Sequence, residues 1–448
     1  MTIAIPETKI RVAVVGTGPG GLAAIINLRK LPYVELSAFD QAKELREVGA
    51  GISINENTWR HLKLLGADEK LEQYTNRGDG SKVDGEQRNG ITGELLARKY
   101  QKINPDAPPR SRIERYKLQR ALLSQIPEDL IRLSKRLSKI EETAKGTTLT
   151  FEDRTTAGPF DLVIGADGLR SVVRQQSFPE HKLSYTGKVA YRTLIPQSAV
   201  AHIPHLPRAS TFWHTKDTHV YTDFLDNGLF EIATRAFESD EEGNKVSWGH
   251  KVPREKVVHH YQGYCEAIRQ VIATPDEWLE FAMFGGPRLE SVISNGRIAL
   301  LGDASHPLSG AFGSGAAFAF EDAYVLTKAL EYTHSRGQPI GEALRLYDEV
   351  RSPHYKGLYA ILNSFGKNAK EIEAISPPLE LNELINETTR RNWTASNEWI
   401  YKYDVEQVTQ VWKEYLDAQE AVSGLSGLTL EKEKAIKEPT IPQIAIEA

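Results

Sequence analysis

Three glycines form the most informative motif in the sequence. Gly16, Gly18 and Gly21 stand in the order G-x-G-x-x-G, directly after a short apolar run. Glycines at this spacing allow a tight turn from a strand into a helix and let a pyrophosphate approach the helix N-terminus. Asp40 follows about twenty residues later, where a carboxylate can accept hydrogen bonds from a ribose diol. The pattern predicts a dinucleotide site; the alternative is a purely structural glycine turn.

Two later segments also end an apolar run with an acidic residue beside glycine. In DLVIGADG, over 161–168, Asp167 follows the apolar residues, although an ordinary turn explains an Asp-Gly pair equally well. In GDASHP, over 302–307, Asp303 follows another apolar run, and small residues continue over 310–317. Small residues at the start of a helix leave room for a flat or phosphorylated ligand against the backbone. The later of the two segments therefore predicts a contact surface for such a ligand.

The elements that would position these motifs follow from hydrophobic patterning. Residues 10–15 and 34–40 are predicted strands, and the helix-forming run 22–30 between them completes a β-α-β unit. Predicted strands over 162–164 and 297–301 lead directly into the two acidic segments. All three motifs are thus expected at the ends of strands.

Composition narrows the class of protein. The chain has 448 residues and a formal net charge of −5, so the basic surface with which nucleic-acid binders meet phosphates is not expected. Cys265 is the single cysteine, which excludes an internal disulfide and fits a reducing compartment. No apolar run approaches the ~18 residues of a membrane span. These features predict a soluble, cytoplasmic protein without a nucleic-acid partner.

A metal site is not expected from the sequence. No group of histidines and acids shows ligand spacing such as HExxH. His259 and His260 are adjacent, and neighbouring side chains should point in different directions on a helix or a strand. The G-x-S-x-G elbow of serine hydrolases is also missing.

Taken together, the three motifs resemble those of the group A flavoprotein monooxygenases, the aromatic hydroxylases that include salicylate hydroxylase and hydroxybenzoate hydroxylases. Segment 46–53 is similar to the family's loop near the flavin, and segment 113–118 to its segment with an FAD-contacting arginine. Departures are Gly310, where many members have proline, Ser314, where many have Gln or Ala, and Asp40 in place of Glu.

The resemblance implies that FAD is the cofactor and that NADH or NADPH is a co-substrate without a Rossmann domain of its own. It implies that the first motif and Asp40 hold the ADP part, and that the other motifs contact the flavin side. The residues expected to bind FAD are Gly16, Gly18, Gly21, Asp40, Ser53, Arg115, Asp167, Asp303, Gly315 and Ala316.

The expected fold class is α/β, with a discontinuous Rossmann-like FAD-binding domain, an inserted β-rich substrate domain and a helical C-terminal region. Aromatic, alternating runs over about 185–290 predict the inserted sheet. The boundaries predicted are 8–75, 113–180 and 290–340 for the FAD-binding domain, 76–112 and 181–289 for the substrate domain, 341–430 for the helical region and 431–448 for a flexible tail. The helical region could serve as a lid, a homodimer surface or a third domain.

Substrate contacts are expected from the inserted sheet. Arg192 and Tyr221 resemble family positions on this sheet, where an arginine can hold a carboxylate or phenolate and a tyrosine can bind a phenolic oxygen. A sheet-edge ion pair and a packed aromatic are the structural alternatives. His214 and His219 are candidate bases, while His306 is expected to shape the flavin loop.

The resemblance implies hydroxylation of a small phenolic acid by O₂ through a flavin C4a-hydroperoxide, with or without release of CO₂. Salicylate and hydroxybenzoates are the expected substrate type. One alternative is hydroxylation of a fungal-type secondary-metabolite phenol, and another is an FAD protein without oxygenase activity. Asp167, with Ser171 and Arg174, favours the oxygenase because this motif also serves the nicotinamide cofactor in the family.

Overall fold

The computed structural model describes residues 9–45, 51–74, 83–100, 111–225, 228–241, 249–308, 310, 312–394 and 397–424. Its central sheet has six strands in the order β18-β19-β11-β1-β2-β7, parallel except at the β18-β19 edge. The strands are β1 (Ile10–Val15), β2 (Val34–Phe39), β7 (Ile131–Arg132), β11 (Leu162–Gly165), β18 (Ile293–Ser294) and β19 (Ile298–Leu300). The inner strands β1, β11 and β19 are mostly buried, which explains their continuous apolar sequence.

Helices cover this sheet. They are α1 (Pro19–Leu28), α2 (Glu56–Leu65), α3 (Glu69–Glu72), α4 (Arg115–Leu123), α5 (Val172–Ser177) and α9 (Gly315–His334). Of these, α1, α5 and α9 follow the strands β1, β11 and β19. Helix α1 begins three residues before the predicted run 22–30, because Pro19 occupies the first helical turn, where its missing N–H costs nothing. Helices α1 and α9 pack against each other, so two N-termini lie close to the ends of β1 and β19.

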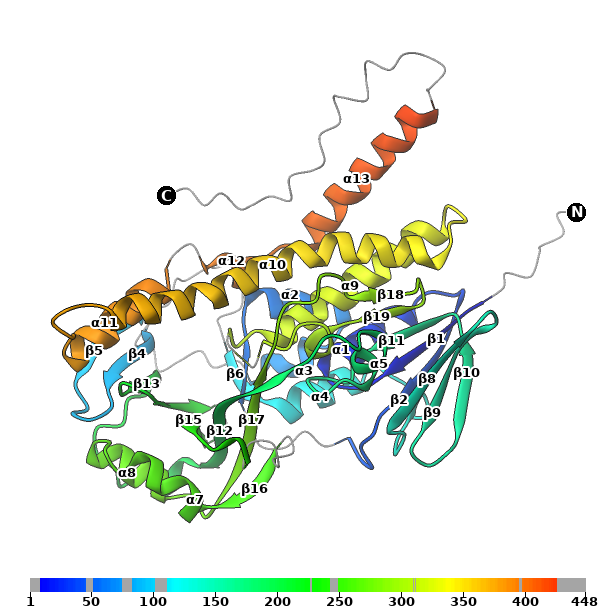
Figure 1. The fold of residues 1–448 in the computed structure, drawn as a ribbon. Helices are drawn as coiled ribbons and strands as arrows, with labels where there is room; N and C mark the ends of the chain where they lie inside the picture. Colours follow the sequence, from blue (N-terminus) through cyan, green and yellow to red (C-terminus); the bar gives the residue numbers. More distant parts are fainter. Residues whose placement is uncertain are drawn as a thin grey trace, which may run out of the picture.

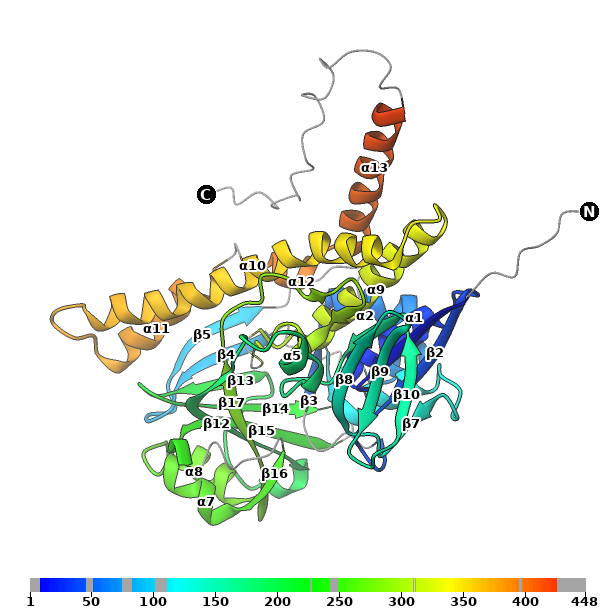
Figure 2. The ribbon, with the colours of Figure 1, turned by 45° about the vertical axis from the view of Figure 1, so that its right-hand side comes forward.

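Two small sheets flank the central one. One is a three-stranded antiparallel sheet of β8 (Leu137–Thr143), β9 (Gly146–Phe151) and β10 (Thr156–Phe160). The other pairs β3 (Gly51–Ile54) with β6 (Ser111–Glu114). The three-stranded sheet lies at the far end of the molecule from helices α7 and α8 in both ribbon views (Figures 1 and 2).

An eight-stranded sheet forms the second large unit, in the order β16-β17-β12-β15-β14-β13-β4-β5. Its strands are β4 (Val83–Asn89), β5 (Leu95–Tyr100), β12 (Ser184–Pro196), β13 (Ser210–His214), β14 (His219–Leu225), β15 (Leu229–Phe237), β16 (His250–Pro253) and β17 (Glu277–Gly285). The short η1 (Gln197–Val200) follows β12. All neighbours are antiparallel except β4 and β13. Strands β4 and β5 lie within the segment 76–112 assigned to the substrate domain, and β5 is an edge strand.

The two faces of this sheet have different roles. Helices α7 (Arg254–Val258) and α8 (Glu266–Ala273), joined through η2 (His259–Tyr261), cover one face with an apolar core that includes Val189 and Tyr191. Ala190 and Arg192 alternate with these residues and point to the opposite face. That opposite face is the one available for a ligand.

The C-terminal region is helical, with α10 (Ile340–Glu373), α11 (Leu381–Asn392), α12 (Trp399–Lys402) and α13 (Val405–Gly424). Helix α10 packs against α9 and extends toward the second sheet, where α11 contacts β4 and β5 (Figure 1). Helix α13 projects from the body in both ribbon views. Among the described residues, none of the helices combines the length and the hydropathy that a membrane crossing requires. The predicted tail 431–448 lies outside the described residues.

Candidate active site

A cleft of about 2480 Å³ joins the strand ends of the central sheet to one face of the eight-stranded sheet. Its wall on the central-sheet side is made by the three motifs, and its wall on the other side by residues of β12 to β15. Pockets for a single small ligand usually measure about 300–1,000 Å³. The cleft is therefore large enough for a dinucleotide together with a second ligand.

The first glycine motif is shaped by close backbone contacts. Gly16 has φ +95°, and a Cβ there would lie 2.4 Å from the carbonyl oxygen of Ala166; a Cβ on Gly21 would lie 2.0 Å from the Gly16 carbonyl oxygen. A Cβ on Gly18 would meet no heavy atom within 4 Å. Gly18 caps α1 without a side-chain hydrogen bond, and the first turn carries no acid. The N-terminus of α1 thus faces the cleft with space for an anion.

Asp40 lies at the end of β2 and lines the cleft. Its Oδ2 accepts hydrogen bonds from the backbone N–H of Thr17 at 2.7 Å and from the Thr17 hydroxyl at 2.6 Å. Its Oδ1 accepts from the N–H of Ala42 at 2.8 Å. The carboxylate thus fixes the glycine turn, and the remaining lone pair of Oδ1 can accept from a ligand hydroxyl.

Asp303 stands in η3 (Gly302–Ala304), directly after β19. Its side chain is exposed in the cleft, and no ion pair or hydrogen bond engages its carboxylate among the described residues. The loop itself is held firmly, because the N–H of Gly302 donates to Oδ2 of Asp322 at 2.9 Å. A rigid loop that presents an uncommitted carboxylate suits the recognition of ligand hydroxyls.

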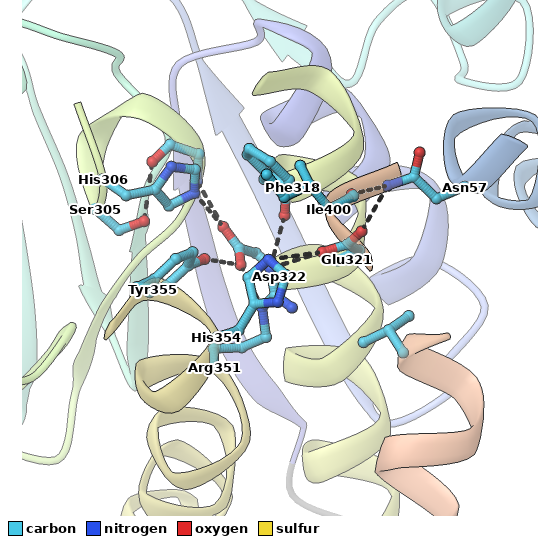
Figure 3. Close-up of polar contacts among 12 residues, drawn as sticks. Asn57, Ser305, His306, Phe318, Glu321, Asp322, Arg351, His354, Tyr355 and Ile400 are labelled. Atoms are coloured by element: carbon cyan, nitrogen blue, oxygen red, sulfur yellow. Dashed lines mark hydrogen bonds and ion pairs between the residues drawn. The ribbon is translucent and has the colours of Figure 1, made fainter. Parts of the chain in front are cut away.

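A buried ionic cluster packs against this loop and holds it in place (Figure 3). Asp322 accepts from Nε of Arg351 at 2.8 Å, and its Oδ2 lies 3.1 Å from Nε2 of His306. Tyr355 donates a hydrogen bond to the same carboxylate. Arg351 also donates to Glu321 at 2.9 Å, and all of these charged groups are buried. The cluster joins α9, α10 and the loop that carries Asp303.

Burial and neighbouring charges set the protonation of this cluster. Burial raises the pKa of Glu321 to about 7, against the attraction of Arg351. For Asp322, burial is outweighed by Arg351 and His306, so its pKa lies below the ordinary value. Asp322 is therefore the anion that balances the Arg351 guanidinium.

Asp167 caps a helix in addition to lining the cleft. Its carboxylate accepts from the Ser171 hydroxyl at 2.5 Å and from the N–H groups of Val172 and Val173 at 2.7 and 3.1 Å. Arg174, 2% exposed, donates to the carbonyl oxygens of Leu169 and Ala304. Arg174 thus ties the Asp167 segment to the Asp303 segment.

The other residues expected to bind FAD also line the cleft. Gly315 and Ala316 begin α9, whose first turn has neither an acid nor a side-chain cap. Ser53 lies on β3 and accepts from Arg112 at 2.8 Å, and Arg115 begins α4. Part of the predicted flavin loop, residues 46–50, lies outside the described residues. Nine of the ten predicted cofactor residues therefore line one cleft. The tenth, Gly21, lies behind this surface, where it packs against the Gly16 carbonyl group.

Arg192 lines the cleft as part of a buried charge cluster. It donates to Glu231 at 3.0 Å and to the Gly51 carbonyl at 3.0 Å. Arg112 donates to both oxygens of Glu231, at 2.6 and 2.9 Å. Burial alone would raise the pKa of Glu231, but the two arginines lower it to about 2. Glu231 thus compensates part of the charge of Arg192. The contacts of Arg192 are those of an ion pair, as in the structural alternative considered from the sequence.

Tyr221 and the two histidines also lie in the cleft. The Tyr221 hydroxyl donates to Asp223 at 2.6 Å, and burial raises the pKa of that aspartate. His214 lies 2.5 Å from the Gln87 side chain, and burial lowers its pKa to about 4. Burial and the charge of Arg235 lower the pKa of His219 as well. Both imidazoles are therefore neutral near pH 7.

Arg235 was not predicted from the sequence. It lies between Ala190 and His219 in the sheet register and lines the cleft. Its single side-chain hydrogen bond among the described residues is to the Met283 sulfur at 3.3 Å, and no carboxylate pairs with it there. Burial and the charge of Arg192 lower its pKa. Alternation along β15 is the signal that could have found it, since Glu231, Ala233 and Arg235 share one face.

The expectation about His259 and His260 is wrong. Their rings lie 3.8 Å apart between centroids, and ligand atoms of both histidines and of Glu238 all lie within 4.8 Å of one another. Successive side chains leave the 3-10 turn η2 about 120° apart, so the side-chain rotamers, and not the backbone, bring the two rings together. These residues do not line the cleft.

Known proteins with similar sequences include FAD-binding enzymes, which fits a dinucleotide site in the cleft. The model of the FAD binding domain family matches residues 9–360. A salicylate hydroxylase of Pseudomonas putida is 27% identical over 421 residues, which cover 89% of this chain and 93% of the relative. A 3-hydroxybenzoate 6-hydroxylase of Polaromonas naphthalenivorans (strain CJ2) is 27% identical over 405 residues, with 88% and 96% covered.

Solved structures share the fold. A salicylate hydroxylase in a substrate complex superimposes with a TM-score of 0.72 at 23% identity, covering 90% of this chain and 98% of that chain. CtdE in complex with FAD and a substrate gives a TM-score of 0.74 at 18% identity, with 93% and 100% covered. The predicted fold class is thus confirmed. The chain belongs to the FAD binding domain family, and the predicted assignment to the FAD-dependent aromatic monooxygenases, a class of enzymes, is confirmed.

Proposed function

We propose that the protein is an NAD(P)H-dependent monooxygenase that hydroxylates a small phenolic acid of the salicylate or hydroxybenzoate type. One observation carries the acidic substrate: the Arg235 guanidinium faces the cleft without a carboxylate partner among the described residues. A cation in this position favours a ligand anion. The names of the relatives, salicylate hydroxylase and 3-hydroxybenzoate 6-hydroxylase, support the same substrate type.

The residues on the central-sheet side fit FAD. A pyrophosphate fits the open space at Gly18 and the uncapped N-termini of α1 and α9. The Asp303 carboxylate, which has no partner among the described residues, can accept hydrogen bonds from ribose or ribityl hydroxyls. Asp40 would hold the adenosine ribose. When bound, FAD supplies electron transfer from NAD(P)H and the activation of O₂.

Residues of the eight-stranded sheet would bind and orient the aromatic acid. Arg235 holds the carboxylate, while Tyr221 and the neutral His219 offer hydrogen bonds to the phenolic oxygen. Proton transfer from the phenol would go through the Tyr221 hydroxyl to Asp223, whose pKa is raised by burial. Arg192, held by Glu231, acts as a positioning group beside the ring. The small side chains of Ala190 and Ala233 leave room for the substrate.

A larger phenolic metabolite is the second candidate, and the size of the cleft supports it. A cleft of about 2480 Å³ has room for more than FAD and a benzoate-sized acid. This candidate shares the chemistry of the first and differs in the ligand that fills the space near Arg235.

The proposal keeps a cytoplasmic location, because a single cysteine offers no stabilisation in an oxidising compartment. O₂ and NADH or NADPH are the co-substrates. The surfaces of α10 and α13 are the part of the chain to test for homodimer formation.

The deciding experiment follows the 450 nm absorbance of the FAD-loaded protein under anaerobic conditions with NADH or NADPH. It is run with and without salicylate, 3-hydroxybenzoate and 4-hydroxybenzoate. Faster bleaching with one acid, and a hydroxylated product after admission of O₂, would support the hydroxylase. Bleaching at one rate under all conditions would favour the larger phenol, and no bleaching by either nucleotide would contradict the monooxygenase.

A further inference from the structure

Glu238, His259 and His260 gather three metal-ligating side chains on the side of the eight-stranded sheet away from the cleft. Glu238 follows β15, and the two histidines begin η2. One ligand atom from each residue can be chosen so that all three lie within 4.8 Å of one another. None of the three residues is among the described residues that line the cleft, so the proposed function does not use the cluster.

The geometry needs little adjustment to hold an ion. Nε2 of His260 lies 2.9 Å from Oε1 of Glu238, and the two imidazole rings lie 3.8 Å apart with an interplanar angle of 37°. A zinc ion with bonds of about 2.0–2.2 Å places its tetrahedral ligand atoms about 3.4 Å apart. The His260–Glu238 pair would have to open by about 0.5 Å, with the ion replacing their hydrogen bond, and the exposed His259 ring would have to turn toward that pair.

Neighbouring groups fix the carboxylate of Glu238. The Tyr191 hydroxyl donates to Oε1 of Glu238 at 2.7 Å, and Tyr191 is completely buried. Lys256 lies 2.9 Å from Oε1 of Glu280, and its charge also acts on Glu238. Hydrogen bonds of this kind orient metal ligands from outside the coordination sphere.

We propose that Glu238, His259 and His260 bind one divalent transition-metal ion, with zinc as the expected occupant. Two imidazoles and one carboxylate suit zinc, copper or nickel and do not suit the all-oxygen preference of calcium or magnesium. Because His259 is exposed, water completes the coordination. The ion would join the end of β15 to η2 and stabilise this side of the substrate sheet.

The test uses the full-length protein after treatment with EDTA and dialysis. Zinc is titrated by calorimetry, and copper is added to a separate sample for electron paramagnetic resonance. We expect saturation at one zinc ion per chain and copper spectra with hyperfine coupling to two imidazole nitrogens. His259→Ala should weaken zinc binding at least tenfold and leave coupling to one nitrogen.

His250→Ala is the matched control, because His250 is also exposed, lies nearby on β16 and is not part of the cluster. Its zinc binding should equal that of the wild type. Unsaturable zinc binding, or equal affinity of the wild type and His259→Ala, would overturn the proposal. Neither result depends on flavin reduction, so the failure of this site and the failure of the proposed function are distinguishable.

Discussion

Arg192 and Arg235 are the same residue type on the same face of one sheet, yet their partners differ. Arg192 shares the carboxylate of Glu231 with Arg112. Arg235 has a thioether sulfur as its side-chain acceptor among the described residues. A half-buried guanidinium without an anion gains more from a ligand carboxylate than one already paired. Substrate charge should therefore be recognised mainly by Arg235.

Arg235→Gln should raise the KM for a carboxylated substrate about 10- to 100-fold, because one charge-assisted hydrogen bond is lost. FAD affinity should not change. The measurement is steady-state kinetics with salicylate and with salicylamide, its uncharged analogue. The KM for salicylamide should change little. Arg254→Gln, on an exposed helix away from the cleft, is the control. Equal KM values for the wild type and Arg235→Gln with salicylate would argue against the assignment.

Asp303→Asn should weaken FAD binding about tenfold or more, since a carboxylate acceptor for ribityl or ribose hydroxyls becomes a neutral amide. Quenching of FAD fluorescence on titration of apoprotein measures the effect. Asp276→Asn is the control and should bind FAD as the wild type does, because Asp276 is exposed, pairs with Arg254 and does not line the cleft. Undiminished FAD affinity of a folded Asp303→Asn protein would remove Asp303 from the cofactor site.

At the scale of elements, the loop that carries Asp303 depends on two long helices. Asp322 on α9 accepts from the Gly302 N–H, and Arg351 on α10 neutralises that aspartate. Glu321 links the same arginine to Asn57 on α2. The helical C-terminal region therefore contributes to the cofactor side of the cleft as well as to its outer surface.

Arg351→Met should lower the free energy of unfolding by about 3–5 kcal/mol, because the buried carboxylate of Asp322 loses its counter-ion and Glu321 loses a hydrogen-bond donor. Urea denaturation measures the change. Arg345→Met on the same helix is the control; Arg345 is exposed and pairs with Glu342 and Glu349, so its loss should cost under about 1 kcal/mol. Equal losses for the two variants would show that the buried cluster does not stabilise the fold.

At the scale of the whole molecule, buried histidines make stability depend on pH. Burial lowers the pKa of His61 to about 3, and burial with the charge of Arg351 lowers that of His354. The unfolded chain takes up protons at these positions below about pH 6.5, whereas the folded protein does not. The contribution of these two histidines to the free energy of unfolding is therefore complete above pH 6.5 and declines as the pH falls below that value. Glu321, whose pKa is raised to about 7, has the opposite effect. The folded protein takes up a proton at Glu321 before the unfolded chain does, so this residue increases the free energy of unfolding as the pH falls from about 7 to 4.5.

The free energy of unfolding should decrease from pH 7.5 to pH 5, by up to about 2 kcal/mol for each of the two histidines before the opposing effect of Glu321. Urea denaturation at both pH values checks this. His61→Leu should reduce the decrease, because the ring packs among apolar and aromatic residues that a leucine can contact. A decrease of the same size in His61→Leu would contradict the role of His61.

The sequence by itself determined the parts of this protein that are local along the chain. Glycine spacing after an apolar strand fixes the turn at Gly16 and the start of α1, because the backbone there excludes a Cβ. Continuous apolar runs identify buried parallel strands, and alternation identifies the second sheet. These signals were enough for the fold class and for a set of cofactor residues that share one cleft.

Only the tertiary structure decided which charges are paired and which residues meet across the chain. Arg192 and Glu231 lie on the adjacent strands β12 and β15 of one sheet, and Arg112 joins them from β6 in a different sheet. Nothing in their local sequence reveals this cluster. The same holds for Arg235, whose importance comes from the lack of a carboxylate near it in the described part of the chain. It holds also for His259 and His260, whose rings meet through side-chain rotation in one tight turn. Local pattern fixes backbone conformation, whereas electrostatic partners and burial depend on contacts between segments far apart in the sequence.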